Sequence, residues 1–176
     1  MDHLDPGNIE PEGSARAPNA TLSLRPEQAE DEDLMRRIYA STRAAELEIA
    51  PWSDAQKQHF LAMQFKLQCA HFRRHYPGAS FSVIMEGGNP AGRLYVNRAE
   101  DEIRILDIAL LPERRGRGAG TLLLRTLLAE GDNAGIPVRL HVERNNRALR
   151  LYERLGFGVI ADQGVYLEME WRRTMQ

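Results

Sequence analysis

The chain has 176 residues, of which 43% are hydrophobic and 27% are charged, a composition typical of one globular domain. No apolar run approaches the ~20 residues of a membrane span, and the chain does not begin with a basic-then-apolar leader. We therefore expect a cytoplasmic protein without a membrane partner. A single cysteine, Cys69, excludes an internal disulfide and a multi-cysteine metal site, and we predict no metal. The helical pattern around it favours an inert thiol over a nucleophile.

The net charge of −2 is unevenly distributed along the chain. Residues 1–33 hold nine acidic side chains and two arginines, which leaves 16 acidic and 21 basic residues in the remainder. A mildly basic body suits a small anionic ligand. It falls short of the basic stripe typical of nucleic-acid-binding proteins, so we predict no nucleic-acid partner.

The first third of the chain predicts a tail, a strand and two helices. Residues 1–19 are rich in Pro, Gly and charge and are predicted to be a disordered tail, followed by one domain over residues 20–173. Residues 20–25 alternate like a strand, and a helix is expected over residues 27–42. Ser53 and Gln56 form a capping-box pattern that begins a second helix, which should run to about His75.

The remaining two thirds predict alternating strands and helices. Residues 80–98 indicate a hairpin that turns at residues 87–90, and residues 102–111 a third, central strand. A helix is expected over residues 118–132, with Gly135 as its stop. Further elements are a strand over 136–142, a helix over 145–156, and two strands within 157–171. The sequence therefore predicts a single α/β domain, a mixed sheet of about seven strands with about four helices.

The stretch "LPERRGRGAG", residues 111–120, begins a helix on poor helix formers. Three glycines stand at every second position, Gly116, Gly118 and Gly120, and three arginines stand beside them, Arg114, Arg115 and Arg117. A helix start exposes unpaired N–H groups and the positive end of the helix dipole, and glycine lets an anion approach them. The arginines can pair with phosphates, so the pattern indicates a pyrophosphate site. The alternative is a surface turn without a ligand.

Two common phosphate-binding motifs do not fit this stretch. The P-loop needs a lysine after its glycines, but Gly120 is followed by Thr121 and Leu122. The dinucleotide fingerprint G-x-G-x-x-G fails because the third glycine comes one residue early.

Two separate motifs resemble the GNAT superfamily of N-acetyltransferases. Arg115-x-x-Gly118-x-Gly120, preceded by a central strand and Pro112, resembles the family's acetyl-CoA motif. "NNRALRLYERLGF", residues 145–157, is similar to its N-x-x-A-x-x-x-Y-E-x-x-G-F segment. The order and spacing of the two also match, and the resemblance spans residues 21–171.

The resemblance implies a GNAT-like fold whose central strands splay apart to form a cleft for coenzyme A. The pantetheine arm would pair with backbone groups of Ile108, Ala109 and Leu110. The pyrophosphate would be held by the N–H groups of seven consecutive residues: Arg115, Gly116, Arg117, Gly118, Ala119, Gly120 and Thr121. Asn145 matches the family's cofactor-contacting asparagine, with Asn146 as a neighbouring candidate. A helix-capping role suits Asn145 equally.

The implied reaction is direct acetyl transfer from acetyl-CoA to a primary amine of a small molecule or peptide, through a ternary complex. Tyr152 matches the family's tyrosine beside the CoA sulphur, where it would contact the cofactor and act as general acid. The alternative is a core tyrosine. His141 and Asp107 are the candidate general bases, and a water chain or purely structural roles are the alternatives. A non-catalytic acyl-CoA-binding sensor is the competing function, which the presence of Tyr152 disfavours.

The acceptor amine is expected to contact residues 45–76, by the same resemblance. Glu46 and Trp52 would receive a cationic amine through charge and cation–π contacts. The alternative is a purely structural segment, in which Phe60, Met63 and Leu67 form the core-facing stripe of the helix and its histidines lie at the surface. We expect a monomer or a homodimer.

Overall fold

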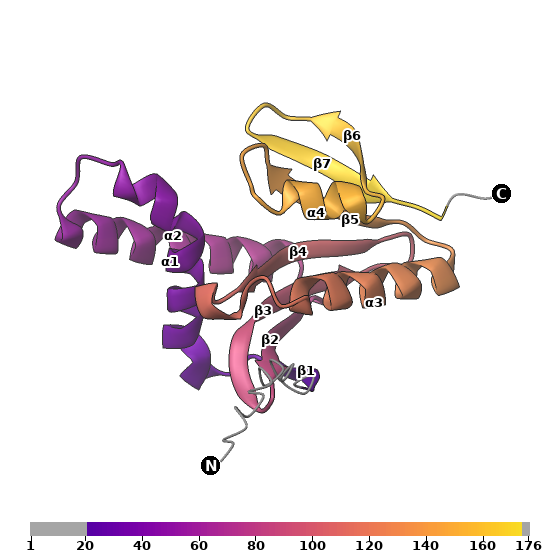
Figure 1. Ribbon diagram of the computed structural model, residues 1–176, viewed down its shortest axis with the longest axis horizontal. Helices are drawn as coiled ribbons and strands as arrows, with labels where there is room; N and C mark the ends of the chain where they lie inside the picture. The colour runs from indigo at the N-terminus through magenta and orange to yellow at the C-terminus, as the bar shows by residue number, and fades with distance from the viewer. Residues whose placement is uncertain (1–20, 174–176) are drawn as a thin grey trace, which may run out of the picture.

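The computed structural model describes residues 21–173, so the predicted tail over residues 1–19 lies outside the described residues. The described part contains one seven-stranded mixed sheet, in the order β1-β2-β3-β4-β5-β7-β6, and four α-helices (Figure 1). The predicted α/β class and the approximate numbers of strands and helices are confirmed. None of these helices has the length and hydropathy to cross a bilayer.

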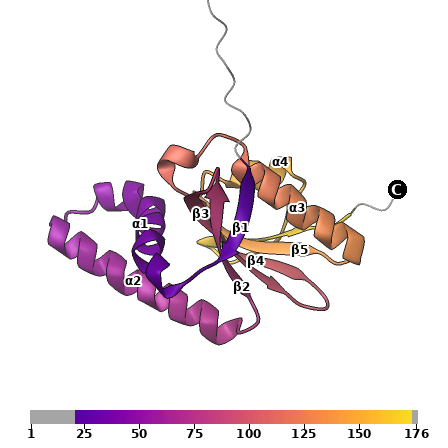
Figure 2. The ribbon, with the colours of Figure 1, turned by 90° about the horizontal axis from the view of Figure 1, so that it is seen from below.

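The N-terminal half of the sheet is an antiparallel meander. It comprises β1 (Leu22–Pro26), β2 (Ser80–Glu86), β3 (Asn89–Arg98) and β4 (Ile103–Leu110). The β2–β3 turn uses Gly87 and Gly88 at positive φ, as the hairpin pattern predicts. Between β1 and β2 the chain forms α1 (Glu32–Glu48) and α2 (Asp54–His75), which lie together on one face of the sheet (Figure 2).

The C-terminal half is built on β5 (Val138–Glu143), which runs parallel to β4. β7 (Tyr166–Trp171) pairs with β5, and β6 (Gly158–Asp162) forms the edge. α3 (Ala119–Ala134) connects β4 to β5 and lies with α4 (Leu149–Arg154) on the face opposite α1 and α2 (Figure 2). Gly135 ends α3 with φ 71°, as predicted.

Each face of the sheet carries its own hydrophobic core. The core under α3 joins Leu124 and Leu127 to buried residues of β4, β5 and β7, and the core under α1 and α2 joins Met35 and Phe65 to Val83. Gly131 brings α3 close to both central strands, because a Cβ there would lie 2.8 Å from Val138 Cγ2 and 3.9 Å from Ile103 Cδ1.

α1 begins later than predicted, because residues 29–31 form a 3₁₀ turn first. The Asp31 carboxylate accepts two hydrogen bonds of 2.7 Å from the Arg25 guanidinium and one of 2.9 Å from the Gln28 N–H. The Arg25 hydrogen bonds lower the pKa of Asp31 to about 2. The helix then runs to Glu48, six residues beyond the expected end.

α2 has the predicted limits but not the predicted orientation. Its capping box is present, with the Gln56 N–H 3.3 Å from Ser53 Oγ and the Ser53 N–H 2.8 Å from Gln56 Oε1. The stripe interpretation is wrong for Met63 and Leu67, which are 46% and 57% exposed, although Phe60 packs against the core as expected. Leu61 and Phe65 face the core instead. The histidines of this segment are exposed, as that interpretation expected: His59, His71 and His75.

The central strands separate, as the fold prediction required. β4 pairs with β5 at three positions, Ile103–Val138, Arg104–Arg139 and Ile105–Leu140, and the described residues of the two strands form no further pairs. A bulge follows at once, because Val96 lies opposite Ile105 but Tyr95 lies opposite Asp107, which leaves Leu106 as the extra residue. A bulge reverses which face the next side chains occupy. Asp107 therefore points to the α1 and α2 side and not into the α3 core.

We expect Gly92→Ala to destabilise the protein, because a Cβ there would lie 2.2 Å from the Ala109 carbonyl oxygen on β4. The strands would have to move apart, at a cost of about 1–3 kcal/mol in the free energy of unfolding. Denaturant unfolding measures this cost. Gly78→Ala is the control, since nothing lies within 4 Å of its Cβ position. Equal stability of the two variants would contradict the close approach of β3 to β4.

Candidate functional site

The separated strands line a cleft of about 530 Å³. One wall comes from α1 and α2 and the other from β5 and the β6–β7 turn, while the unpaired part of β4 lies between them. Three of the predicted site residues line it: Asp107, Ile108 and His141. The cleft also receives Asn146, the alternative to Asn145.

Asp107 is held by a buried arginine that the sequence analysis missed. Arg93 on β3 is 1% exposed and donates to Asp107 Oδ2 and, over 2.8 Å, to Gln68 Oε1. Its guanidinium also lies 5.8 Å from the Tyr39 ring centroid and 5.1 Å from that of Tyr95. Since a buried charge is costly unless it is paired, Asp107 balances Arg93 in the interior. This pair explains how a central strand tolerates a carboxylate.

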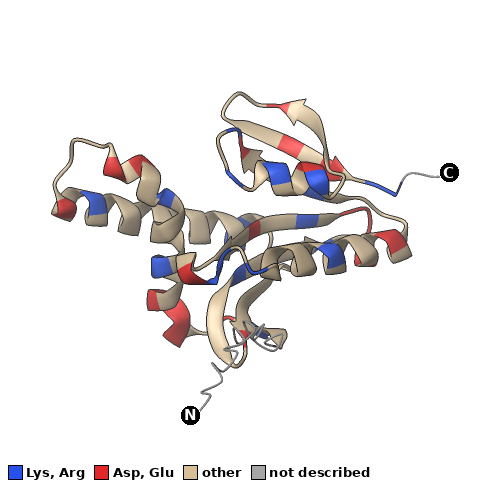
Figure 3. Cartoon of the chain, viewed as in Figure 1, with Lys and Arg blue, Asp and Glu red and all other residues tan. Residues whose placement is uncertain are grey.

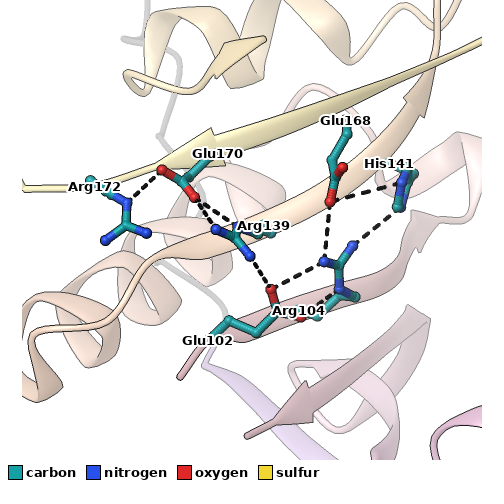
Figure 4. A network of polar contacts seen from close by, with 7 residues as sticks. All are labelled: Glu102, Arg104, Arg139, His141, Glu168, Glu170 and Arg172. Atoms are coloured by element: carbon teal, nitrogen blue, oxygen red, sulfur yellow. Dashed lines mark hydrogen bonds and ion pairs between the residues drawn. The ribbon is translucent and has the colours of Figure 1, made fainter. Parts of the chain in front are cut away.

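His141 lies at the edge of a charged network on the open face of β4, β5 and β7 (Figure 4). Its Nδ1 is 3.4 Å from an Arg104 guanidinium nitrogen, and its Nε2 is 4.0 Å from Glu168 Oε1. Arg104 itself bonds to Glu168 over 3.1 Å and to Glu102 over 2.6 Å. The imidazole therefore borders the cleft with one charged group near each ring nitrogen.

The same network continues away from the cleft. Arg139 donates hydrogen bonds to Glu102 over 2.9 Å and to Glu170 over 2.7 Å, and Glu170 also accepts a hydrogen bond from Arg172 (Figure 4). Burial opposes ionisation of Glu102, but hydrogen bonds from Arg104 and Arg139 outweigh it and lower its pKa. The acidic and basic side chains balance one another across three strands and fix the side chains beside His141.

Tyr152 lies in the core under α3 and is not a cleft-lining residue. It is buried, and its ring packs against Phe157 with the centroids 5.7 Å apart. Burial and, to a smaller extent, the charge of Asp107 raise the pKa of Tyr152. Its phenol therefore keeps its proton at neutral pH. The effect of Asp107 also shows that the two side chains interact electrostatically across the gap between β4 and β5.

The start of α3 presents unpaired backbone N–H groups, as predicted. Gly116 and Gly118 have φ of 73° and 89°, and a Cβ at either would meet no atom within 4 Å. The helix makes its first hydrogen bond from Leu122 to the Gly118 carbonyl over 3.0 Å. The amides of residues 116–121 have no acceptor within the described part of the chain, whereas the Arg115 amide bonds to Pro112 over 3.2 Å. We call residues 116–121 the amide cradle.

Two arginines, Arg115 and Arg147, supply positive charge beside the amide cradle, whereas Arg114 is paired with Glu86 over 3.1 Å. The Arg115 side chain donates to the Leu110 carbonyl and to Ser41 Oγ, each over 2.9 Å. Burial and then the charge of Arg147 lower the pKa of Arg115. Two mutually repelling cations beside bare amides favour a bound polyanion. Arg147 lies inside the second motif, but the motif pattern gave it no role.

The helix predicted over residues 145–156 is shorter in the structure, where α4 spans Leu149–Arg154. The Asn146 side chain accepts the Ala148 N–H over 2.8 Å, so Asn146 makes the local turn and α4 starts only at Leu149. Asn145 is exposed, and its side chain makes no hydrogen bond within residues 21–173. The N-cap of α4 is Ala148, and no side chain caps the helix, so the capping role considered for Asn145 is wrong and its amide is available to a ligand.

The two predicted acceptor residues lie outside the cleft. Glu46 contacts Arg43 over 3.1 Å, and Arg43 also bonds to the cleft-lining Glu143 over 2.8 Å. Trp52 contributes instead to a separate groove on α2. Glu143 and Tyr166 line the cleft itself, and the Tyr166 hydroxyl is 3.2 Å from that carboxylate.

The single cysteine and the arrangement of possible metal ligands are two further features of the described chain. Cys69 is half-buried, and burial raises the pKa of its thiol, which disfavours a nucleophilic thiolate. Residues 21–173 contain no cluster of three His, Cys, Asp or Glu side chains arranged for a metal ion.

Solved structures of other proteins share this fold. The fold is similar to that of the PaiA N-acetyltransferase from Thermoplasma acidophilum in complex with coenzyme A, with 22% identity, a TM-score of 0.63, and coverage of 87% of this chain and 99% of that one. It is also similar to the ribosomal-protein-S18-alanine N-acetyltransferase from Escherichia coli, with 20% identity, a TM-score of 0.58, and coverage of 89% and 96%. No curated protein matches the sequence.

The family assignment rests on the sequence itself. Residues 35–157 match the family model described as the Acetyltransferase (GNAT) family. The matched region runs from α1 to the end of the second motif and includes the bulge, the amide cradle and every cleft-lining residue except Gln163 and Tyr166. Because it covers well over half of the chain, this protein belongs to the GNAT family of acetyltransferases.

Proposed function

We propose that this protein is an N-acetyltransferase that moves the acetyl group of acetyl-CoA directly to a primary amine in a ternary complex. One observation carries the proposal: the unpaired edge of β4 leads straight to the amide cradle. An extended thioester with a pyrophosphate at its far end has the shape and charge that this arrangement fits. Membership of the GNAT family and the coenzyme A complex of the PaiA relative support the same conclusion.

The residues present fit acetyl-CoA, which supplies an activated acetyl thioester. The amide cradle would hold the pyrophosphate, since no side chain blocks Gly116 or Gly118. Backbone groups of residues 108–110 would pair with the pantetheine arm, although the Leu110 carbonyl already accepts a bond from Arg115. Asn145 and Arg147 lie on the opposite side and would contact the same molecule.

Tyr152 is proposed as the general acid. Because burial raises its pKa, its phenol is protonated over the whole physiological range and can donate to the departing thiolate. A buried donor also loses no proton to bulk water.

The general base is proposed to be His141 or Asp107. Free alkylamines have a pKa near ~10.4, so the acceptor must lose a proton before it attacks. Asp107 faces the cleft with one carboxylate oxygen bonded to Arg93, which leaves the other oxygen for the amine. His141 is more exposed and lies where the strands separate.

The acceptor is proposed to enter between α1 and the β6–β7 turn, where Tyr39, Arg43, Glu143 and Tyr166 line the cleft. Glu143 offers its second carboxylate oxygen to an amine, since Arg43 and Tyr166 contact only Oε1, and Tyr39 and Tyr166 offer aromatic faces. In this scheme Glu46 does not contact the amine directly but holds Arg43, which lines the cleft. The predicted contact between Trp52 and the amine stays a prediction, because Trp52 does not line the cleft. Small amines and peptide amines both suit an opening of this polarity.

A thiol-release assay tests the proposal. Acetyl-CoA is incubated with the protein and a panel of amines, polyamines, amino acids and peptides, and free CoA thiol is measured. We expect release that depends on an amine and exceeds hydrolysis. If acetyl-CoA raises the melting temperature but no amine releases thiol, the protein is an acyl-CoA-binding sensor and not a transferase.

Gly118→Glu should abolish protection by acetyl-CoA. The new carboxylate would lie in the amide cradle and repel the pyrophosphate, so the ligand-induced rise in melting temperature should largely disappear. Gly135→Glu is the matched control, since Gly135 also has positive φ and open space but ends the same helix. Equal protection of both variants would place the phosphates elsewhere.

Tyr152→Phe should lower kcat by roughly 10²-fold while the KM for acetyl-CoA changes little, because the ring stays packed and only the proton is lost. The raised pKa adds a pH expectation. Wild-type kcat should not fall on the alkaline side until above pH ~10, the ordinary tyrosine pKa, since the buried phenol stays protonated there. An unchanged kcat in the variant would make Tyr152 a packing residue.

The pH profiles of His141→Ala and Asp107→Asn should identify the base. Wild-type activity should rise with pH, and the variant that lacks the base should lose that rise. Since Asp107→Asn also leaves Arg93 buried without its counter-ion, the melting temperature is measured in parallel to separate loss of fold from loss of base. Retention of the full profile by both variants would assign the proton to water.

A further inference from the structure

The buried guanidinium of Arg93 uses only one of its three nitrogens. Nη2 donates to Asp107 Oδ2 and to Gln68 Oε1, whereas Nε and Nη1 have no acceptor within residues 21–173. Arg93 is almost wholly buried, and a buried N–H group without an acceptor is destabilising, most of all on a charged side chain. Because Arg93 also lines the cleft, a molecule bound there can supply the missing oxygen atom.

Arg104, the other arginine that the central strands bring to the cleft, is fully paired. β4 presents one basic and one acidic residue, Arg104 and Asp107 (Figure 3). Arg104 Nε and Nη2 bond to Glu102 over 2.6 and 3.1 Å, and Nη1 lies 3.4 Å from His141 Nδ1. The sheet therefore provides partners for all three nitrogens of one cleft-lining guanidinium, while the described chain leaves two nitrogens of Arg93 unused.

Charge balance favours a neutral oxygen at Arg93. Asp107 already compensates the positive charge of this side chain, and the second acceptor, Gln68 Oε1, is a neutral amide oxygen. A carboxylate from a ligand would bring a second negative charge into the interior, which is unfavourable unless another cation pairs with it. A carbonyl oxygen accepts the same hydrogen bonds without that charge, so Arg93 suits an amide or peptide carbonyl group.

Asp107 offers a contact for an amine at the same point of the cleft. Its Oδ2 accepts a hydrogen bond from Arg93, and its Oδ1 accepts none from the described residues. Both side chains line the cleft. Because they are hydrogen-bonded to each other, a molecule that contacts both must carry its amine and its oxygen close together, as on adjoining carbon atoms.

We propose that the acceptor is an α-amino carbonyl compound, either an amino-acid amide or the first residue of a peptide, whose amine binds Asp107 Oδ1 and whose carbonyl oxygen binds Arg93. This inference rests on the proposed acetyl transfer and names its substrate class. Proton removal is also easier for such a substrate, because a peptide α-amine has a pKa of about 7.7–8.0, against ~10.4 for an alkylamine. Arg93 is then a specificity-determining residue, and polyamines and lysine side chains, which lack the neighbouring oxygen, are poorer acceptors.

Binding to the wild-type protein tests the carbonyl contact. Isothermal titration calorimetry compares two pairs of compounds that differ only in a carboxamide group: phenylalaninamide with phenethylamine, and leucinamide with isopentylamine. In each pair the amide should bind at least about tenfold more tightly, because only the amide gives Arg93 an oxygen. Equal binding within the pairs, or no binding by either amide, would overturn the proposal.

Two further ligands identify the oxygen and its source. Phenylalanine, which has a carboxylate in place of the carboxamide, should bind less tightly than phenylalaninamide, and tighter binding would overturn the neutral carbonyl. Phenylalanylglycinamide should bind more tightly than phenylalaninamide if the substrate is a peptide, and equally if it is an amino-acid amide. Thiol release from acetyl-CoA with the same compounds tests the transfer separately, since amide binding without release would contradict the proposed function and leave this site supported.

Arg93→Lys tests the residue itself. Lysine keeps a positive charge beside Asp107 but removes the Nε and Nη1 donors, so the preference for phenylalaninamide over phenethylamine should largely disappear. Arg104→Lys is the matched control and should keep the preference, because Arg104 also lines the cleft but has a partner at each nitrogen. Melting temperatures show whether both variants fold, and the wild-type comparison decides the question if Arg93→Lys does not. An unchanged preference in folded Arg93→Lys would refute the role of Arg93.

Discussion

Three residue pairs join the two halves of the sheet, and the candidate site depends on their number. Beyond Ile105 the ladder stops, so the edge of β4 keeps unpaired N–H and C=O groups that a polar ligand can satisfy. The bulge at Leu106 comes at the same point and turns Asp107 toward the cleft. A sheet with full pairing between β4 and β5 would have neither the cleft nor the exposed backbone.

The second constraint is electrostatic. Arg93 is a full charge in the interior, and Asp107 is the acidic side chain that it contacts. Its aromatic neighbours, Tyr39 and Tyr95, belong to the α1 and α2 side. The charge pair therefore connects the hairpin of helices to the central strand, and it holds the cleft-facing carboxylate in one orientation. Asp107, which we propose as a candidate base, is therefore also a residue that the fold needs.

Much of the fold followed from local pattern, because glycines, caps and alternation act over a few residues. The Ser53 cap, the stop at Gly135 and the glycines of the amide cradle are local in this sense. Arg93 and the bulge at Leu106 depend on pairing between strands, which no local pattern encodes. The buried face of α2 was mispredicted for a different reason. Apolar residues recur at helical spacing on two faces of this helix, and the sequence does not show which face is covered.

The position of Gly131 bears on how the cleft can change its width. α3 touches β4 and β5 at the level of their three residue pairs, through Ile103 and Val138. The two half-sheets are therefore held at the narrow end of the cleft by the strand pairs and by α3. Toward the wider end they are held by side chains, because Arg43 on α1 bonds to Glu143 on β5 over 2.8 Å. The width of the cleft is thus set at one end by backbone and helix packing and at the other by a charge pair, which a change of side chain can remove.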